Sequence, residues 1–148
     1  MPACRIIVAV GLPGSGKSSY FDRLRVNAIS SDEVRRMLLD DAGDQSVNAR
    51  VFQTVRHLAA QRLRIGRPET YIDATNLARW ERQPYVRLAR ACGARAEVLF
   101  FPASVEVCLE RNRGRPRQVP EDALRAMAAR LEPPTVEEGF ASVTVVEA

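Results

Sequence analysis

The sequence is poor in several residue types that often carry chemistry. Its 148 residues include one lysine, one histidine, one tryptophan and three cysteines. The histidine, His57, lies in an apolar helical pattern with no cysteine or carboxylate at ligand spacing, so histidine-based chemistry is not expected. The cysteines, Cys4, Cys92 and Cys108, are odd in number and lack metal-like spacing. A reduced cytoplasmic chain without a metal cluster is therefore favoured over a disulfide framework.

Long apolar runs are also missing, and no signal peptide is recognisable, so we expect no association with a membrane. The length and a composition of 46% hydrophobic and 27% charged residues predict one globular domain over residues 1–148. The formal net charge of +4 permits an anionic partner such as nucleic acid but does not require one.

Lysine scarcity singles out one position, because the chain has twenty-one arginines but only Lys17 as lysine. Lys17 follows an apolar run at Arg5–Val10 and stands in the sequence GLPGSGKS, a complete phosphate-binding loop. A lysine ammonium can reach between terminal phosphates, whereas a guanidinium is wider and more directional. The motif predicts binding of ATP, or another nucleoside triphosphate, by the residues Gly11, Pro13, Gly14, Ser15, Gly16, Lys17, Ser18 and Ser19.

A magnesium site is expected beside this loop. The Ser18 hydroxyl is a ligand for Mg²⁺ in such motifs, and Asp73 ends a second predicted strand at 70–73. Ligands of open α/β sheets bind at the carboxyl ends of strands. Asp73 with Thr75 and Asn76 could instead make only a turn and a helix cap.

Strand-like and helical segments alternate along the chain, which predicts an α/β three-layer sandwich around a mostly parallel sheet of about five strands. Beyond the first two strands, we expect strands at 98–101 and 143–146. Helices are predicted after the loop, at about 46–65, from 79 or 81 to 92, and from Pro120 onward.

Asp32 and Arg35 are three residues apart and would share one face of a helix. One interpretation is structural, since Ser30 with Glu33 fits a capping box and Asp32 with Arg35 a surface ion pair. The functional interpretation makes Asp32 the acceptor of a hydroxyl proton and Arg35 the ligand of an anionic group on the same substrate.

Residues 111–117 hold four arginines with a glycine and a proline, in an alternation that argues against an ordinary amphipathic helix. Dense like charges repel unless an anion is present, so we expect a mobile lid at about 111–119 that becomes ordered around phosphates. A solvated arginine loop is the alternative.

Taken in order, GLPGSGKS, SSDEVR, IDATNL, the arginine segment and VPEDALRAMAARLEPPTVEEGF resemble the polynucleotide 5′-hydroxyl kinases, phage-type and bacterial end-healing enzymes of the P-loop phosphotransferase superfamily. The resemblance covers most of the chain. It implies a P-loop nucleotide-kinase-like fold and transfer of the γ-phosphoryl of ATP, with Mg²⁺, to the 5′-OH end of RNA or DNA.

The resemblance also implies roles for matching residues. Lys17 would hold the β- and γ-phosphates, Asp32 would activate the hydroxyl, and Arg35 would contact the neighbouring phosphate. Arg111 would brace the transferring group together with Arg115, for which Arg113 is the competing match. Thr75, Asn76 and Arg82 would touch substrate, although Arg82 could equally be a solvated helix residue.

Departures from relatives limit these expectations. The chain has no acidic pair of the phosphatase type and, beyond Lys17, no lysine for nucleotidyl transfer. Two alternatives remain: a kinase acting on a sugar, antibiotic or metabolite, and a non-catalytic nucleotide-binding module. No run of aromatic residues suggests base stacking, and Trp80 is expected to pack rather than stack.

Overall fold

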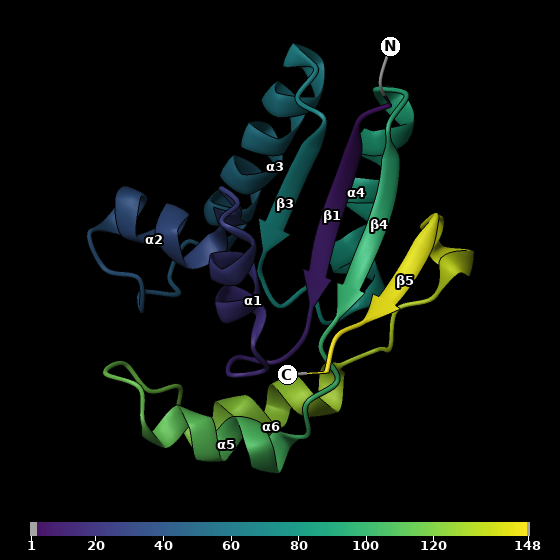
Figure 1. The fold of residues 1–148 in the computed structure, drawn as a ribbon. Coiled ribbons are helices and arrows are strands. Elements are labelled where there is room, and N and C mark those ends of the chain that lie inside the picture. The colour runs from purple at the N-terminus through teal and green to yellow at the C-terminus, as the bar shows by residue number, and fades with distance from the viewer. Residues whose placement is uncertain (1–2, 148) are drawn as a thin grey trace.

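The computed structural model describes residues 3–147 and contains a five-stranded sheet in the order β2-β3-β1-β4-β5 (Figure 1). All four strand pairs are parallel. The strands are β1 Arg5–Val10, β2 Ile29–Ser30, β3 Glu69–Asp73, β4 Arg95–Phe100 and β5 Ser142–Val145. This confirms the predicted α/β fold, although the short strand β2 was not anticipated.

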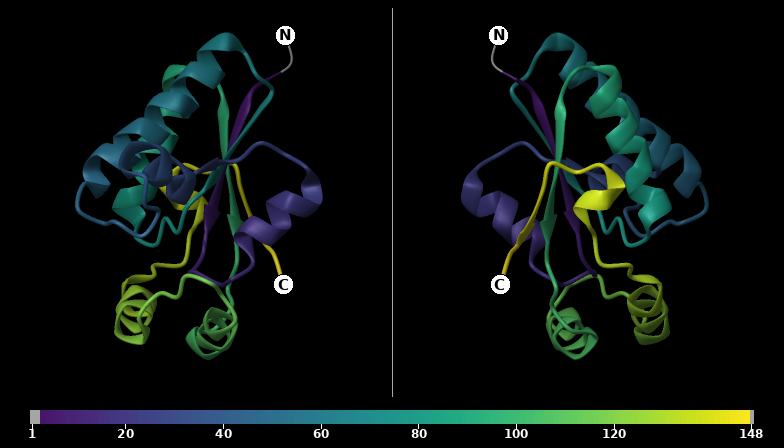
Figure 2. Two further views of the ribbon diagram at one scale, coloured as in Figure 1. Left: turned by 90° about the vertical axis from the view of Figure 1, so that its left-hand side faces the viewer. Right: turned by 90° about the vertical axis from the view of Figure 1, so that its right-hand side faces the viewer.

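Helices cover both faces of the sheet. They are α1 Lys17–Leu24, α2 Ser31–Leu39, α3 Asn48–Ile65, α4 Arg79–Ala91, α5 Val105–Arg113 and α6 Glu121–Arg130, with a short 3₁₀ helix, η1, at Val136–Glu138. In the side views, α1 lies on one face while α3 and α4 lie on the other, and α5 and α6 lie below the sheet (Figure 2). Within the described chain, no helix is long and apolar enough to span a membrane.

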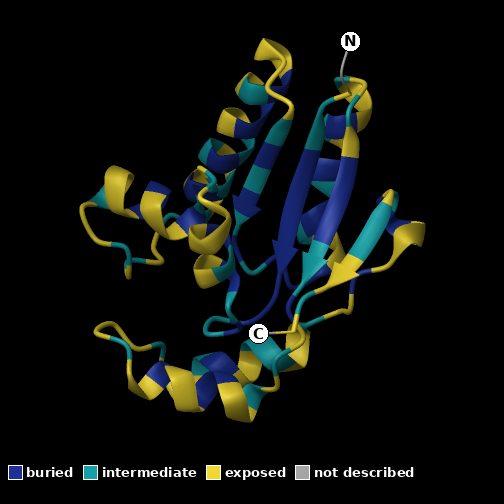
Figure 3. Ribbon diagram, viewed as in Figure 1, coloured by how far each residue is buried: buried dark blue, intermediate teal, exposed yellow. Residues whose placement is uncertain are grey.

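The core follows from the pattern of apolar residues. In the central strand β1, the five residues from Ile6 to Val10 are at most 2% exposed, as a strand covered on both faces requires (Figure 3). On α3, Val51, Val55 and Ala59 recur every four residues and are fully buried against the sheet. The helix ends at Gly66, whose φ of 94° few other residues adopt.

The sequence did not predict α5. The first part of the arginine segment, residues 111–113, belongs to this helix rather than to a loop. The buried face of α5 consists of Cys108, Leu109 and Asn112, so a polar residue occupies a position where the pattern needed an apolar one. Asn112 is satisfied by two hydrogen bonds to Val119: its Nδ2 donates to the Val119 carbonyl (2.6 Å), and the Val119 N–H donates to its Oδ1 (2.9 Å). These bonds close residues 113–118 into a loop.

All strands of a parallel sheet end at one edge, and here that edge gathers the polar motifs. The glycine-rich loop follows β1, α2 follows β2, and Asp73 ends β3. The arginine segment and α6 lie below the same edge (Figure 1). Segments far apart in sequence are thereby brought to one site.

Candidate active site

The glycine-rich loop has the backbone geometry that the motif predicts. Gly14 and Gly16 have φ of 84° and 105°, in the region that favours glycine. A Cβ on Gly11 would lie 2.6 Å from the Ser15 Oγ and 3.0 Å from the Phe101 carbonyl oxygen, so a side chain there would displace its neighbours. Gly16 is the N-cap of α1 and provides no side-chain cap. The first N–H groups of α1 therefore remain for an anion.

Lys17 lies against its own loop. Its Nζ donates to the carbonyl oxygens of Gly11 (3.0 Å) and Leu12 (2.8 Å), and the residue is 8% exposed. Burial lowers the pKa of Lys17 from 10.5 to about 8, while the charges of Asp73 and Asp32 act in the opposite direction and Arg115 adds to the lowering. Acidic and basic residues from three distant segments thus act on the Lys17 ammonium.

Ser18 and Asp73 lie together, as expected for a magnesium site. The Ser18 Oγ donates to Asp73 Oδ2 at 2.8 Å. Burial raises the pKa of Asp73, although the Ser18 hydroxyl and the Lys17 charge oppose this rise. A hydroxyl and a carboxylate beside a phosphate-binding loop are hard oxygen ligands of the kind that Mg²⁺ takes, with its remaining positions left to water and phosphate. No group of three or more His, Cys, Asp or Glu within residues 3–147 is placed to hold a metal without such help.

Asp32 and Arg35 form the ion pair that their spacing predicts. The Ser30 Oγ accepts from the Glu33 N–H (3.2 Å), which fixes the start of α2. The Arg35 Nη1 donates to Asp32 Oδ1 (2.8 Å), and the Arg35 side chain is 4% exposed while that of Asp32 is 53% exposed. Asp32 therefore presents an accessible carboxylate that a buried guanidinium orients.

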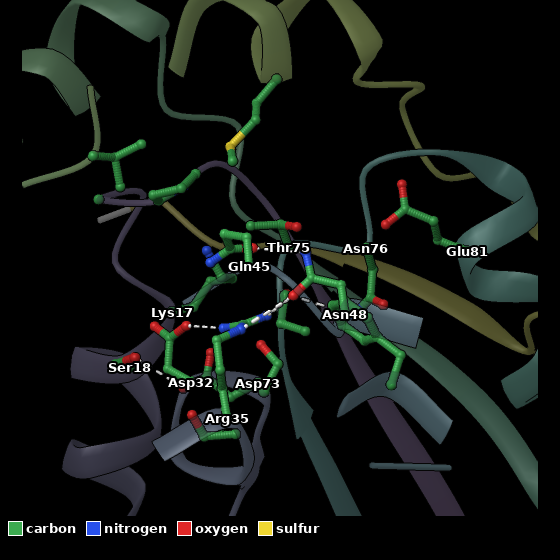
Figure 4. Close-up of a pocket in the computed structure, with 18 of the residues that line it drawn as sticks. Lys17, Ser18, Asp32, Arg35, Gln45, Asn48, Asp73, Thr75, Asn76 and Glu81 are labelled. Carbon is green, nitrogen blue, oxygen red and sulfur yellow. Dashed lines mark hydrogen bonds and ion pairs between the residues drawn. The ribbon is translucent and has the colours of Figure 1, made fainter. Parts of the chain in front are cut away.

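Asn48, which no sequence motif marks, contacts the other side of Arg35. Its Oδ1 accepts from the Arg35 Nε (3.2 Å) and Nη2 (3.1 Å), and its Nδ2 donates to Gln45 Oε1 (2.7 Å). Figure 4 shows Asp32 and Asn48 on opposite sides of the Arg35 guanidinium, in the same cavity as Lys17, Ser18 and Asp73. Only the fold, by packing α2 on α3, brings Asn48 to this place.

The arginine segment approaches the site in three places. The Arg111 Nη1 donates to the Gly14 carbonyl (3.0 Å), and Arg115 lines the cleft. Arg113, the competing match, pairs instead with Glu110 on an exposed surface. Arg117, which the sequence analysis did not select, donates through Nη2 to Asp32 Oδ2 at 3.3 Å. The segment thus contacts both the glycine-rich loop and Asp32.

Thr75 and Asn76 follow Asp73 into the same cleft. The Thr75 carbonyl accepts from the Gly11 N–H (3.0 Å), which couples this turn to the glycine-rich loop. Asn76 has a φ of 46° and is 3% exposed, and its Nδ2 donates to the Ala9 carbonyl (2.8 Å). Its amide therefore stabilises the end of β1. The turn of the structural interpretation is present, but the expected cap is not, because α4 has Ala78 as its N-cap and Glu81 as its capping partner.

Arg82 corrects an expectation, because the residue is fully buried and does not line the cleft. Its Nε and Nη2 donate to the two carboxylate oxygens of Glu138 (2.8 and 2.9 Å), while Nη1 donates to the carbonyls of Asn76 and Leu77 (both 2.9 Å). A guanidinium committed in this way has no accessible surface for a substrate. Arg82 is a structural residue that supports the turn carrying Asn76.

Known structures share this architecture. A protein of Chloroflexus aurantiacus described as a candidate kinase aligns over 99% of this chain and 86% of its own, with 19% identity and a TM-score of 0.75. A chain of the Pnkp1/Rnl/Hen1 RNA repair complex aligns over 88% of this chain, with 22% identity and a TM-score of 0.74, but this chain spans only 45% of its length. A gluconokinase of Sinorhizobium meliloti aligns over 99% of this chain and 82% of its own, with 20% identity and a TM-score of 0.61.

These likenesses, all below 25% identity, concern the fold. A family model described as an AAA domain matches residues 6–134, which is most of the chain. The glycine-rich loop between β1 and α1 and the five-stranded parallel sheet agree with that assignment. The chain belongs to the AAA domain family and has the fold of a P-loop kinase.

Proposed function

We propose that this protein is a kinase that transfers the γ-phosphoryl group of ATP to the 5′-OH end of RNA or DNA. The observation that carries the proposal is the placement of Asp32, an accessible carboxylate oriented by a buried arginine, in the same cleft as Lys17. A loop that only binds nucleotide does not need such a group. A phosphotransferase needs it to align the attacking hydroxyl.

Each residue has a part in this reaction. Lys17 and the N–H groups of the glycine-rich loop hold the terminal phosphates. Ser18 and Asp73 would hold Mg²⁺, which neutralises charge on those phosphates. Arg111 and Arg115 approach from α5 and the following loop, where their charge can stabilise the phosphoryl group during transfer.

Asp32 would accept a hydrogen bond from the acceptor hydroxyl and take up its proton as the new oxygen–phosphorus bond forms, while the bond between the γ-phosphorus and the β,γ-bridging oxygen breaks and ADP leaves. Asp32 Oδ1 is held by Arg35, and Oδ2 by Arg117 at the longer distance of 3.3 Å. Exchange of the Arg117 contact for the hydroxyl would leave the orientation by Arg35 intact. The Arg35 side chain is 4% exposed and lines the cleft, and this small accessible part would contact a substrate phosphate.

A polynucleotide acceptor is supported by the order of motifs across the chain and by the RNA repair chain among similar structures. The cleft has a volume of about 1590 Å³ and extends well beyond the glycine-rich loop, which leaves room for an acceptor beside ATP. A small-molecule kinase is the second candidate, because a gluconokinase has a similar fold.

The test is a transfer assay with γ-labelled ATP and Mg²⁺, in which 5′-OH RNA, 5′-OH DNA, gluconate and a mixed metabolite extract are offered separately. We expect label in one or both oligonucleotides. Label in a metabolite alone would support the second candidate, and label in none of them would contradict kinase activity on these acceptors.

Asp32→Asn is the decisive variant, because it keeps the shape of the side chain but cannot accept a proton. We expect phosphoryl transfer to fall by roughly 10²-fold or more, in line with loss of a general base, while the affinity for ATP stays within about twofold. Asp122→Asn is the matched control, since Asp122 is exposed on α6 and does not line the cleft. Equal loss of ATP binding and transfer in Asp32→Asn would make Asp32 a structural residue.

A further inference from the structure

Trp80, the only tryptophan of the chain, is 71% exposed at the start of α4. The expectation that it packs in the interior is therefore wrong. Trp80, Pro84 and Arg87 are four and three residues apart, so they share one face of α4, and all three line the same cleft as Asp32. An isolated exposed aromatic residue needs no explanation, but this one borders the candidate active site.

Two other helices complete this part of the cleft. Phe52 and Arg56 of α3 line it, as do Met127 and Arg130 of α6. The end of α6 is tied to the start of α4, because the Glu132 N–H donates to the Leu77 carbonyl (2.9 Å) and Glu132 Oε1 accepts from the Arg79 N–H (3.2 Å). We call the part lined by these faces of α3, α4 and α6 the distal branch of the cleft.

The distal branch combines apolar surface with arginine side chains. Among residues 3–147, none of Arg56, Arg87 and Arg130 forms a salt bridge with a carboxylate. Glu81, the carboxylate that lines this part of the cleft, accepts from the Ala78 N–H (3.2 Å) and caps α4. Aromatic faces beside arginines suit single-stranded nucleic acid, whose bases stack while its phosphates attract cations. A sugar would instead need several hydrogen-bonding groups around it.

The distal branch also lies in a suitable direction from the acceptor carboxylate. Asn48, which holds Arg35, is followed on the same face of α3 by Phe52 and Arg56. Arg56 lies eight positions after Asn48, which corresponds to a rise of about 12 Å along the helix. That length corresponds to roughly three stacked nucleotides.

We infer that Trp80 is a stacking platform for a nucleobase near the 5′ end of a single-stranded polynucleotide, with Arg87 and Arg130 beside its phosphates. This inference rests on the proposed function and specifies how the acceptor is held. A strand whose 5′-OH lies at Asp32 then passes Arg35 and places one of its following bases on the indole.

Fluorescence tests the subsite directly, because Trp80 is the sole indole and stacking on a base quenches its emission. The probes are single-stranded 5′-OH oligothymidylates of two to eight nucleotides, and abasic phosphodiester chains of the same lengths, titrated without ATP. We expect saturable quenching that requires bases and that strengthens with length up to about four nucleotides. Equal quenching by abasic chains, or no quenching by either, would overturn the inference.

Kinetics provide the second measurement. Trp80→Ala should raise the KM for a 5′-OH oligonucleotide by roughly 5- to 150-fold, the range for losing one base stack, while kcat and the KM for ATP change less than about twofold. Trp80→Phe should recover part of the loss. Ile65→Ala is the matched control, since Ile65 is 73% exposed at the far end of α3, outside the cleft. An unchanged oligonucleotide KM in Trp80→Ala would contradict the subsite.

The two proposals fail in different ways. Base-dependent quenching without any oligonucleotide phosphorylation would retain the subsite and reject the kinase. Phosphorylation of oligonucleotides with no quenching and no effect of Trp80→Ala would retain the kinase and reject the subsite.

Discussion

Lys17 is a buried ammonium, and this makes a specific prediction about stability in the absence of nucleotide. Its pKa falls from 10.5 to about 8 through burial, so the charged form is less stable in the folded protein than in the unfolded chain. Below about pH 8, Lys17 is protonated in both the folded and the unfolded state. Burial of its charge then lowers the free energy of unfolding by roughly 3 kcal/mol. As pH rises from about 8 to about 10.5, folded Lys17 releases its proton first, and the penalty disappears.

Lys17→Met isolates this effect, because methionine fills a similar volume without a charge. Both proteins keep every other titrating group, so the pH dependence of the difference between their free energies of unfolding comes mainly from Lys17, with a smaller part from Cys108, whose pKa the Lys17 charge lowers. Integrated over the interval, wild type should gain about 2–3 kcal/mol relative to Lys17→Met between pH 7 and pH 10. The methionine variant loses two hydrogen bonds to the Gly11 and Leu12 carbonyls, which shifts the difference by a constant and leaves its pH dependence.

Urea unfolding followed by circular dichroism at pH 7, 8, 9 and 10 gives the measurement, at one ionic strength and without nucleotide or Mg²⁺. The free energy of unfolding of wild type minus that of Lys17→Met should increase with pH, most steeply between pH 8 and pH 10. A difference that stays constant within about 0.5 kcal/mol would refute the reasoning, since it would mean that Lys17 titrates alike in the folded and unfolded states.

Three further predictions concern activity and stability. Lys17→Arg keeps the charge but should reduce transfer by roughly hundredfold or more, because a guanidinium cannot occupy the narrow phosphate position; near-normal turnover would contradict this. Asp73→Asn should raise the Mg²⁺ concentration for half-maximal activity by about 10- to 100-fold, measured by metal titration at saturating ATP, and an unchanged requirement would remove Asp73 from the metal site. Arg82→Met should lower the free energy of unfolding by about 3–5 kcal/mol, because Glu138 is left buried and unpaired, and the double variant with Glu138→Leu should recover most of the loss in urea titrations. Failure of that double variant to recover would assign the loss to packing rather than to charge.

The parts of the site that could be predicted from sequence are local ones. The glycine-rich loop, the cap at Ser30 and the ion pair between Asp32 and Arg35 each depend on residues within a few positions of one another, where backbone geometry fixes the outcome. The alternation of apolar runs with helical patterns likewise predicted the parallel sheet, because each element shows its own period.

The remainder depended on contacts between distant segments. Asn48 meets Arg35 only because α3 packs on α2, and nothing in the residues around Asn48 marks it. Arg82 failed as a substrate residue because its partner lies 56 positions away at Glu138. Helix α5 was missed because Asn112 takes an inward position and satisfies its amide through Val119. Trp80 was expected to pack, as a tryptophan usually does. Its exposure depends on its position at the start of α4, which the sequence does not show.

Because Arg82 pairs with Glu138, the turn at the candidate site is fully supported only after residue 138 has joined the fold. Arg82 holds the carbonyls of Asn76 and Leu77, so the turn below the glycine-rich loop is braced by a carboxylate that the chain supplies only at position 138. During synthesis, a growing chain would already contain the phosphate-binding loop, Asp32 and the arginine segment while the turn between β3 and α4 still lacked its brace. A residue in the last tenth of the sequence, Glu138, thus braces a turn of the candidate active site from outside the cleft.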